Sequence, residues 1–355
     1  MFFKGKQTSL GIDIGTSSIK LVELQKEGEF IHLKNYAEYK PEDDLKDLIT
    51  FRSSMTPFSE TELTSILKNI ISASGIESRR ANFSIPVFSS FLTLIEMPQM
   101  SDEDIARAIE FQANKYIPVP LSEVFLNWVV IRENNNSIQQ NSKDKIEVLL
   151  VAAPKDIIER YSRLASDVGF ELGLLEVENF SLVRSLCSSK NLNLIIDIGA
   201  RTSSVTIVDN GFIRLSSFLE FSGFHFTKAI TERLKVDEAR AERLKMENGL
   251  LKKPQNQVRE AILPLFDKLS FFVESAISIY LGKNPDKEFE KIILTGGSSR
   301  IPGILEYFSE RFKIPVEKGN PFFKISYPQI LKDKIQEIAP NFSIACGLAL
   351  GDFEV

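Results

Sequence analysis

Apolar residues along the chain follow two kinds of pattern, helical spacing and short continuous segments, which alternate. Between Glu60 and Ala73 they lie three or four positions apart, which is the spacing of one buried face of a helix. Ser9–Ile14 and Ile19–Leu24 are instead short apolar segments joined by the small and hydroxyl residues of Gly15–Ser18, so they are expected to form a hairpin. Further helices are expected at Lys155–Val168, Glu178–Ser188, Thr227–Leu234, Asp237–Met246, Val258–Leu281 and Pro302–Phe312, and strands at Ala81–Pro86, Phe91–Met97, Phe125–Ile131, Ile146–Ala152, Leu192–Ile198, Val205–Val208 and Lys291–Thr295. This alternation is typical of an α/β fold.

One helix and one polar loop mark a separate unit within this alternation. Ser101-Asp102-Glu103-Asp104 has the pattern of a capping box, and the helix that it begins is expected to continue until Pro118 and Pro120 stop it. The Asn- and Gln-rich stretch Glu133–Lys145 is expected to be a solvated loop between two strands. Residues 88–152 are therefore a candidate inserted module.

Composition narrows the classes of function. The length of 355 residues suggests roughly two domains. The 43 basic and 48 acidic residues form no long run of either sign, which argues against nucleic acid as a partner. The cysteines, Cys187 and Cys346, and the histidines, His32 and His225, are too few for a disulfide framework or a zinc cluster. We expect a cytosolic chain with neither a signal peptide nor a membrane-spanning helix.

The chain repeats one pattern. Gly11–Val22 resembles Ile195–Val208, because each has an apolar strand containing an aspartate, a turn that begins with glycine and a second apolar strand. The repeat predicts two related halves. In strand alternation Asp13 stands beside the first turn, whose N–H groups and hydroxyls suit phosphate oxygens. Its carboxylate would hold a hydrated Mg²⁺ ion, and Lys20 on the return strand would add a positive charge.

A third turn follows an apolar strand later in the chain. In Ile292–Gly303, the pair Gly296-Gly297 leaves space without side chains where a flat ring could approach the backbone. Taken singly, the three turns also fit ordinary hairpin tips and a tight strand-to-helix connection. The chain contains no Gly-x-x-x-x-Gly-Lys-Ser/Thr or Gly-x-Gly-x-x-Gly sequence, so P-loop and dinucleotide-binding folds lack their usual signatures.

Together and in this order, the three turns resemble the phosphate-1, phosphate-2 and adenosine motifs of the superfamily of actin, sugar kinases and heat-shock chaperone ATPases. The resemblance implies an actin-like ATPase fold, in which two duplicated halves enclose a nucleotide cleft and the first half carries a small inserted module. The implied domains are 1–87 with 153–191 (first-half core), 88–152 (inserted module), 192–224 with 288–355 (second-half core) and 225–287 (helical subdomain).

Within this superfamily, two segments are similar to the PilM family of type IV pilus assembly proteins, relatives of the division protein FtsA. The first is Ala108–Pro120 with the following Glu123-Val124, and the second runs from Phe226–Ile230 to Ala241–Lys245. The resemblance implies ATP and Mg²⁺ as cofactors, with Asp13 and Asp197 flanking the metal. The implied nucleotide-binding residues are Gly15, Thr16, Ser17, Ser18, Lys20, Gly199, Arg201, Thr202, Ser203, Gly223, Glu242, Lys245, Gly296, Gly297, Ser298 and Arg300.

Some residues have alternative interpretations. Glu242 and Lys245 lie on one helical face, where a solvated ion pair is the alternative to nucleotide binding. The family tends to carry Gly-Gly-Asn before its Phe-Thr pair, whereas this chain has Ser222-Gly223-Phe224-His225. No catalytic base is assigned, because Glu96, Glu110 and Gln112 all fit surface positions.

Three functions are weighed. The first is an ATP-binding adaptor with at most slow hydrolysis. It would lie at the cytoplasmic face of the inner membrane, contact other pilus platform proteins and dock the N-terminal tail of a PilN-like inner-membrane protein between the module and the first half. The second is an FtsA-like protein that self-associates into filaments. The third is a sugar-kinase-type phosphotransferase, for which we find no aspartate base.

Overall fold

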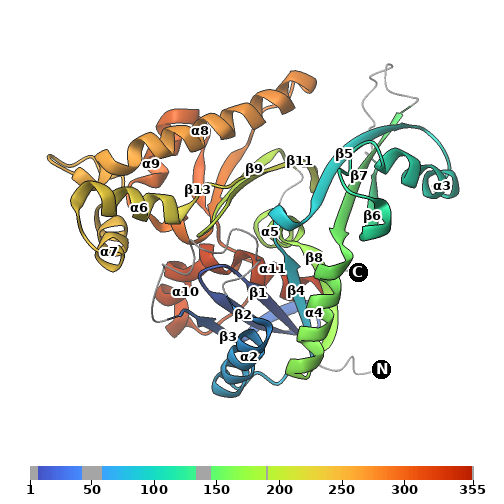
Figure 1. The fold of residues 1–355 in the computed structure, drawn as a ribbon, viewed down its shortest axis with the longest axis horizontal. Helices are drawn as coiled ribbons and strands as arrows, with labels where there is room; N and C mark the ends of the chain where they lie inside the picture. Colours follow the sequence, from blue (N-terminus) through green and yellow to red (C-terminus); the bar gives the residue numbers. More distant parts are fainter. Residues whose placement is uncertain (1–6, 42–57, 133–144, 189–190, 354–355) are drawn as a thin grey trace.

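The computed structural model describes residues 7–41, 58–132, 145–188 and 191–353 (Figure 1). Within these residues the strands form two five-stranded sheets and one three-stranded sheet. Figure 1 shows the first five-stranded sheet with α2 and α4 in one lobe, α6 to α9 in a second lobe, and β5 to β7 with α3 at the side. None of the described helices is long and apolar enough to span a bilayer. Residues 133–144 of the predicted loop Glu133–Lys145 lie outside the described residues.

The first sheet has the order β3-β2-β1-β4-β8. Its strands are β1 (Gln7–Ile14), β2 (Ile19–Glu27), β3 (Phe30–Tyr39), β4 (Arg80–Ile85) and β8 (Glu171–Val177). β1 to β3 pair antiparallel, and β4 and β8 add in parallel. One face is covered by α2 (Glu60–Ser74) and α4 (Lys155–Val168), because Leu63 and Leu67 of α2 and Leu164 of α4 pack on the strands. α2 is closed by a capping box at Ser59 and by Gly75, which has φ of 68°.

The second sheet repeats the first, strand for strand. Its order is β11-β10-β9-β12-β13, and the pairing is again antiparallel twice and then parallel twice. The strands are β9 (Asn193–Ile198), β10 (Ser203–Asp209), β11 (Phe212–Leu219), β12 (Lys291–Thr295) and β13 (Val316–Lys318). The duplication predicted from the sequence repeat is therefore confirmed.

Helices α6 (Gly223–Leu234), α7 (Glu238–Asn248), α8 (Gln257–Lys283) and α9 (Ile304–Phe312) form the second lobe with this sheet. Stacked rings of Phe226 and Phe266, with centroids 4.3 Å apart, join α6 to α8. The predicted helix start at Pro302 is wrong by two residues. Gly303 has φ of 81° and caps α9, so Pro302 belongs to the preceding turn.

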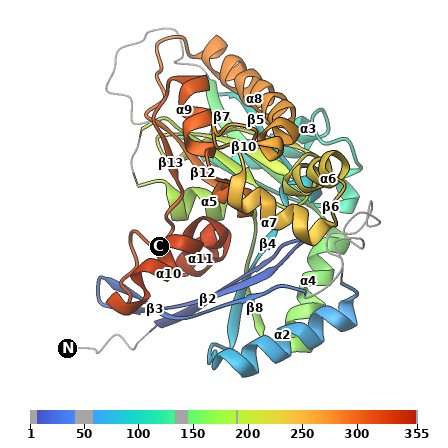
Figure 2. The ribbon, with the colours of Figure 1, turned by 90° about the vertical axis from the view of Figure 1, so that its left-hand side faces the viewer.

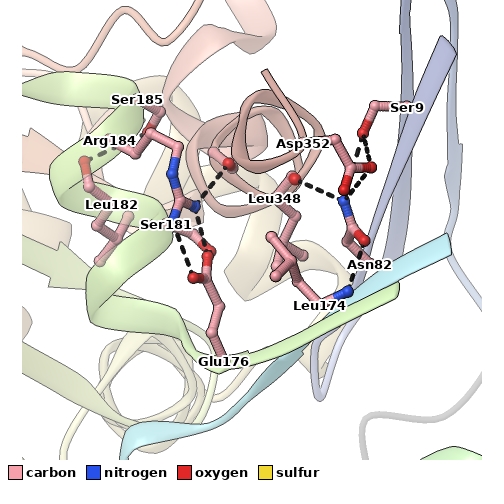
Figure 3. A network of polar contacts seen from close by, with 11 residues as sticks. Ser9, Asn82, Leu174, Glu176, Ser181, Leu182, Arg184, Ser185, Leu348 and Asp352 are labelled. Atoms are coloured by element: carbon pink, nitrogen blue, oxygen red, sulfur yellow. Dashed lines mark hydrogen bonds and ion pairs between the residues drawn. The ribbon is translucent and has the colours of Figure 1, made fainter. Parts of the chain in front are cut away.

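The end of the described chain returns to the first sheet. α10 (Lys332–Ile338) and α11 (Ser343–Gly351) lie on the side opposite α2, as Figure 2 shows, and α5 (Glu178–Leu186) packs beside α11. Gly347 permits this approach, because a Cβ atom there would be 2.0 Å from the carbonyl oxygen of Ser181. The contacts in Figure 3 fix α11: Asn82 donates to the carbonyl of Leu348 at 3.0 Å, and Arg184 donates to that of Gly347 at 2.9 Å.

The module consists of β5 (Phe91–Pro98), α3 (Asp102–Ala113), β6 (Val124–Ile131) and β7 (Lys145–Pro154). The strands pair antiparallel in the order β5-β7-β6. The Oγ of Ser101 accepts the N–H of Asp104, which is one of the two bonds of the predicted capping box. α3 ends at Ala113, well before Pro118. α3 covers one face of the sheet, and Ile131 and Leu149 on the other face contact Ile213 of β11. The module therefore also contacts the second half.

Candidate functional site

The first candidate turn is the tip of the β1–β2 hairpin. The N–H of Gly15 donates to the carbonyl of Ser18 at 3.0 Å, which closes the turn. Asp13 and Lys20 are paired across the two strands, and Lys20 Nζ lies 3.5 Å from the Asp13 carboxylate. Asp13 is only 7% exposed, and Ser84 Oγ donates to it at 3.4 Å. The turn thus carries a buried carboxylate and one cation at its base.

The second candidate turn repeats this geometry between β9 and β10. The N–H of Gly199 donates to the carbonyl of Thr202 at 3.0 Å, the same distance as in the first turn. The start of α6 is bonded to this turn, because Gly223 N–H donates to the Gly199 carbonyl at 3.0 Å and Phe224 N–H to the Ala200 carbonyl at 3.1 Å. These two N–H groups are therefore already used within the protein.

The third candidate turn follows β12 and touches Asp197. Thr295, the last residue of β12, is in register with Asp197 of β9. Gly296 has φ of 82°, and a Cβ atom there would lie 2.5 Å from Asp197 Oδ1. A Cβ atom at Gly297 would meet no atom within 4 Å. Gly296 is thus required by packing, whereas Gly297 borders open space.

Lys245 of α7 lies beneath the start of α6. It is 3% exposed, and its Nζ donates to Thr227 Oγ1 at 2.8 Å and to the Gly223 carbonyl at 3.1 Å, and forms an ion pair with Glu242 at 2.6 Å. Burial lowers the pKa of Lys245, and the Glu242 carboxylate opposes this shift. The alternative of a solvated surface pair is wrong for Lys245. Ser298 also lies close to the start of α6, since a Cβ atom at Gly223 would be 2.4 Å from the Ser298 Oγ.

Three carboxylates from different elements share one environment. Burial, followed by the charge of Asp13, raises the pKa of Asp197 to about 7, and Lys20 opposes this shift. Burial, followed by the charges of Asp197 and Asp13, raises the pKa of Glu178 to about 8. The Val87 N–H donates to Glu178 at 3.1 Å. The negative charge of Asp13 in the first half therefore acts on Asp197 in the second half.

Glu178 is a site residue that sequence reasoning missed. It is the first residue of α5, and an acidic residue in the first turn of a helix has an ordinary explanation in the helix dipole. Its nearness to two aspartates could be recognised only after folding. The earlier candidates for a base lie on the module: Glu96 is paired with Lys145, Gln112 accepts from Lys115, and Glu110 belongs to α3.

Two arginines of the predicted site have other partners. Arg300 forms an ion pair with Glu337 of α10 at 3.1 Å. The Arg201 guanidinium lies over the ring of Phe88, 5.0 Å from its centroid, and so connects the second turn to the first half. Thr16, Ser17, Ser18 and Thr202 lie at the two turns. Ser203 is the first residue of β10, and its Oγ donates to the Phe221 carbonyl at 2.6 Å.

The donor set fits a magnesium nucleotide better than a metal ion held by protein alone. Among the described residues, no three or more His, Cys, Asp or Glu side chains are grouped to hold a metal ion. Mg²⁺ commonly uses one or two carboxylates together with phosphate oxygens and water. Asp13 and Asp197 supply two carboxylates beside glycine turns. At one of these turns, a side chain in place of Gly296 would collide with Asp197.

Comparisons with known proteins agree with this architecture. The family described as type IV pilus assembly protein PilM matches residues 11–353. The solved PilM-PilN type IV pilus biogenesis complex superposes with a TM-score of 0.81 at 22% identity, covering 98% of this chain and 99% of that chain. EutJ, an ethanolamine utilization protein from Carboxydothermus hydrogenoformans, superposes with a TM-score of 0.56 at 16% identity, covering 97% of this chain and 89% of that chain. MreB5 of Spiroplasma citri bound to ADP superposes with a TM-score of 0.55 at 14% identity, covering 98% of this chain and 96% of that chain.

Curated relatives include the cell division protein FtsA. The protein of Neisseria meningitidis is 22% identical over 70% of this chain, and the match spans 66% of its own length, about two thirds. The protein of Streptococcus pneumoniae is 23% identical over 86% of this chain and 74% of its own length. The structural likenesses confirm the predicted actin-like ATPase fold.

Proposed function

The chain belongs to the family of the type IV pilus assembly protein PilM, and we propose that it is an ATP-binding adaptor of a pilus assembly platform. The observation that carries the nucleotide part is the approach of Asp13 and Asp197, one from each half, beside two turns of matching geometry and Gly296. MreB5, which shares the fold, is solved with ADP and with AMPPNP, and this supports the proposal.

In this proposal Asp13 and Asp197 are the residues that would hold Mg²⁺, and the ion would supply positive charge beside the phosphates. The turns 15–18 and 199–202 would offer backbone N–H groups other than those of Gly15 and Gly199, together with hydroxyls, to the phosphates, with Lys20 as a cation. Gly297 and Ser298 border the adenosine. Lys245 would support the start of α6 from beneath instead of binding the phosphates. Its Nζ is fully occupied by the Gly223 carbonyl, Thr227 and Glu242. Glu178 is the candidate to orient water, with hydrolysis slow at most.

The partner part of the proposal is the cytoplasmic N-terminal tail of a PilN-like inner-membrane protein, which would place the chain at the cytoplasmic face of that membrane. A solved relative is named as a PilM-PilN complex. In this chain, Phe125 and Val129 of β6 are 53% and 41% exposed. Phe125 lies beside Lys155, the first residue of α4, where the module meets the first half. Apolar side chains of an extended tail would pack there.

Calorimetry on the full chain tests both parts separately. We expect Mg²⁺-dependent ATP binding, lost in Asp197→Asn and kept in Asp286→Asn, whose side chain lies on the surface beyond α8. Absence of ATP binding by the wild type would reject the nucleotide part.

A PilN-like tail peptide should bind with micromolar affinity, on the order of −8 kcal/mol. Phe125→Ser should weaken it, whereas Phe271→Ser, at an exposed phenylalanine of α8, should not.

The FtsA relatives favour one second candidate, self-association into filaments. Sedimentation of the full chain with and without ATP separates it from the adaptor. Pelleting that requires ATP would support filaments, and a monomer at every concentration would reject them.

A further inference from the structure

The start of α6 is capped by an unusual residue. The Ser222 N–H donates to Nδ1 of His225 at 3.2 Å, so the imidazole takes the place that Glu or Gln occupies in an ordinary capping box. The backbone bond in the other direction is also present, because the His225 N–H donates to the Ser222 carbonyl at 2.9 Å. The sequence showed only that this stretch departs from the family pattern. The structure shows what the histidine does there.

This cap also sets the second candidate turn. Ser222, the capped residue, donates through its Oγ to the carbonyl of Ala200. The next two N–H groups, of Gly223 and Phe224, donate to the carbonyls of Gly199 and Ala200. The backbone that His225 holds is thus the same backbone that fixes the position of the turn.

The surroundings of His225 favour the neutral ring. Its imidazole lies between two phenylalanines, with centroids 5.0 Å from Phe221 and 5.8 Å from Phe224. The charged groups that face it are Lys268 of α8, Lys228 of α6 and Glu220 before the cap. Burial, and then the two lysines, lower its pKa, and Glu220 opposes them. A nitrogen that accepts an N–H bond must keep its lone pair, so Nδ1 carries no proton in this arrangement.

We propose that His225 is a positioning residue for the second phosphate turn, and that it holds the turn only while its ring is neutral. Protonation at Nδ1 replaces the acceptor by a donor that faces the Ser222 N–H, which removes the cap and releases the turn. Nucleotide affinity should then fall as the medium is acidified. The inference rests on the nucleotide function proposed above and assigns to it a pH-sensitive element.

The sign of the pH effect follows from the direction of the shift. Because folding lowers the pKa of His225 below 6.5, its stabilising contribution is complete above that value and is lost as the pH falls through the lower folded-state pKa. The loss should therefore occur on the acidic side of neutrality, and the site should be intact in neutral and mildly alkaline solution.

His225→Gln is the decisive variant, since glutamine accepts a capping bond but does not titrate. ATP affinity with Mg²⁺ would be measured by calorimetry on the full chain from about pH 8 to about pH 5.5. We expect the wild type to weaken about fivefold more than His225→Gln over this range, and His225→Leu to be about fivefold weaker than wild type near pH 8. The titration of ATP itself affects all variants equally.

A wild-type pH profile in His225→Gln would overturn the proposal, as would unchanged affinity in His225→Leu. If His225→Leu does not fold, the comparison of wild type with His225→Gln still decides. If the wild type binds no ATP near pH 8, the proposed function fails. In that case thermal unfolding at each pH still tests the cap, because the wild type should lose stability on acidification relative to His225→Gln.

Discussion

Gly296 lies directly against the carboxylate of Asp197. A Cβ atom at Gly296 would come within 2.5 Å of Asp197 Oδ1, and the backbone φ of 82° is strained for any other residue. The end of β12 therefore fixes the position of a candidate metal ligand on β9.

We expect Gly296→Ala to lower the free energy of unfolding by about 2–4 kcal/mol. The matched control is Gly297→Ala, which meets no atom within 4 Å and should keep its stability. Urea unfolding measures both. If Gly297→Ala also loses ATP affinity at unchanged stability, the open space beside it is occupied by the nucleotide. Equal stability of the two variants would contradict the predicted contact.

Replacing Glu178 should separate hydrolysis from binding. Glu178 is buried, and the charges of Asp197 and Asp13 act on it. Glu178→Gln keeps the shape of the side chain but removes the group that would orient water. We expect hydrolysis to fall by about a hundredfold or more, with ATP affinity changed less than about threefold. Single-turnover phosphate release measures the rate, and Glu171→Gln, at the exposed start of β8, is the control. Hydrolysis at the wild-type rate in Glu178→Gln would exclude this role.

Glu178→Gln also gives a prediction of how the stability of the protein without nucleotide or metal depends on pH. Folding raises the pKa of Glu178 from 4.5 to about 8, so its contribution to stability is complete below 4.5 and is lost as the pH rises through about 8. In the presence of EDTA, the wild type should thus become less stable relative to Glu178→Gln across this interval. Thermal unfolding at several pH values measures the difference, and parallel curves would refute it.

Lys245 should matter for the folding of the second lobe. Lys245→Met removes the donor to the Gly223 carbonyl and to Thr227, and we expect a loss of about 1–3 kcal/mol in unfolding free energy. Lys252→Met serves as control, because Lys252 is 64% exposed in its pair with Glu310 and should lose little. A loss of similar size in both variants would argue against a special role for the buried lysine.

The module should depend on one ion pair with the second half. Arg214 of β11 is 5% exposed and pairs with Glu147 of β7. We expect a coupling free energy of about 1–2 kcal/mol in a double-mutant cycle of Arg214→Ala and Glu147→Ala. The exposed pair of Arg132 and Asp102 should give a much smaller coupling. Proteolysis within the module should also become faster in Arg214→Ala, and an unchanged cleavage rate would contradict its attachment at this contact.

The local elements and the repeat could be predicted from the sequence. The hairpin tips 15–18 and 199–203 were recognisable because a glycine turn between apolar strands is a local pattern, and Asp13 and Asp197 lie at matching places in it. α4 was predicted with its observed bounds because its apolar face has the helical period. α11 was not predicted, since Ser343–Gly351 is buried almost all round and shows no amphipathic face.

The tertiary structure alone decided what these elements bring together. Glu178 joins the two aspartates, Lys245 is buried under Gly223, and His225 caps the residue that holds the second turn. The module contacts β11, which follows it by more than fifty residues in the sequence. Periodicity and turn patterns report the interactions of near neighbours along the chain. Contacts between distant segments, and the burial that shifts a pKa, exist only after the halves have packed.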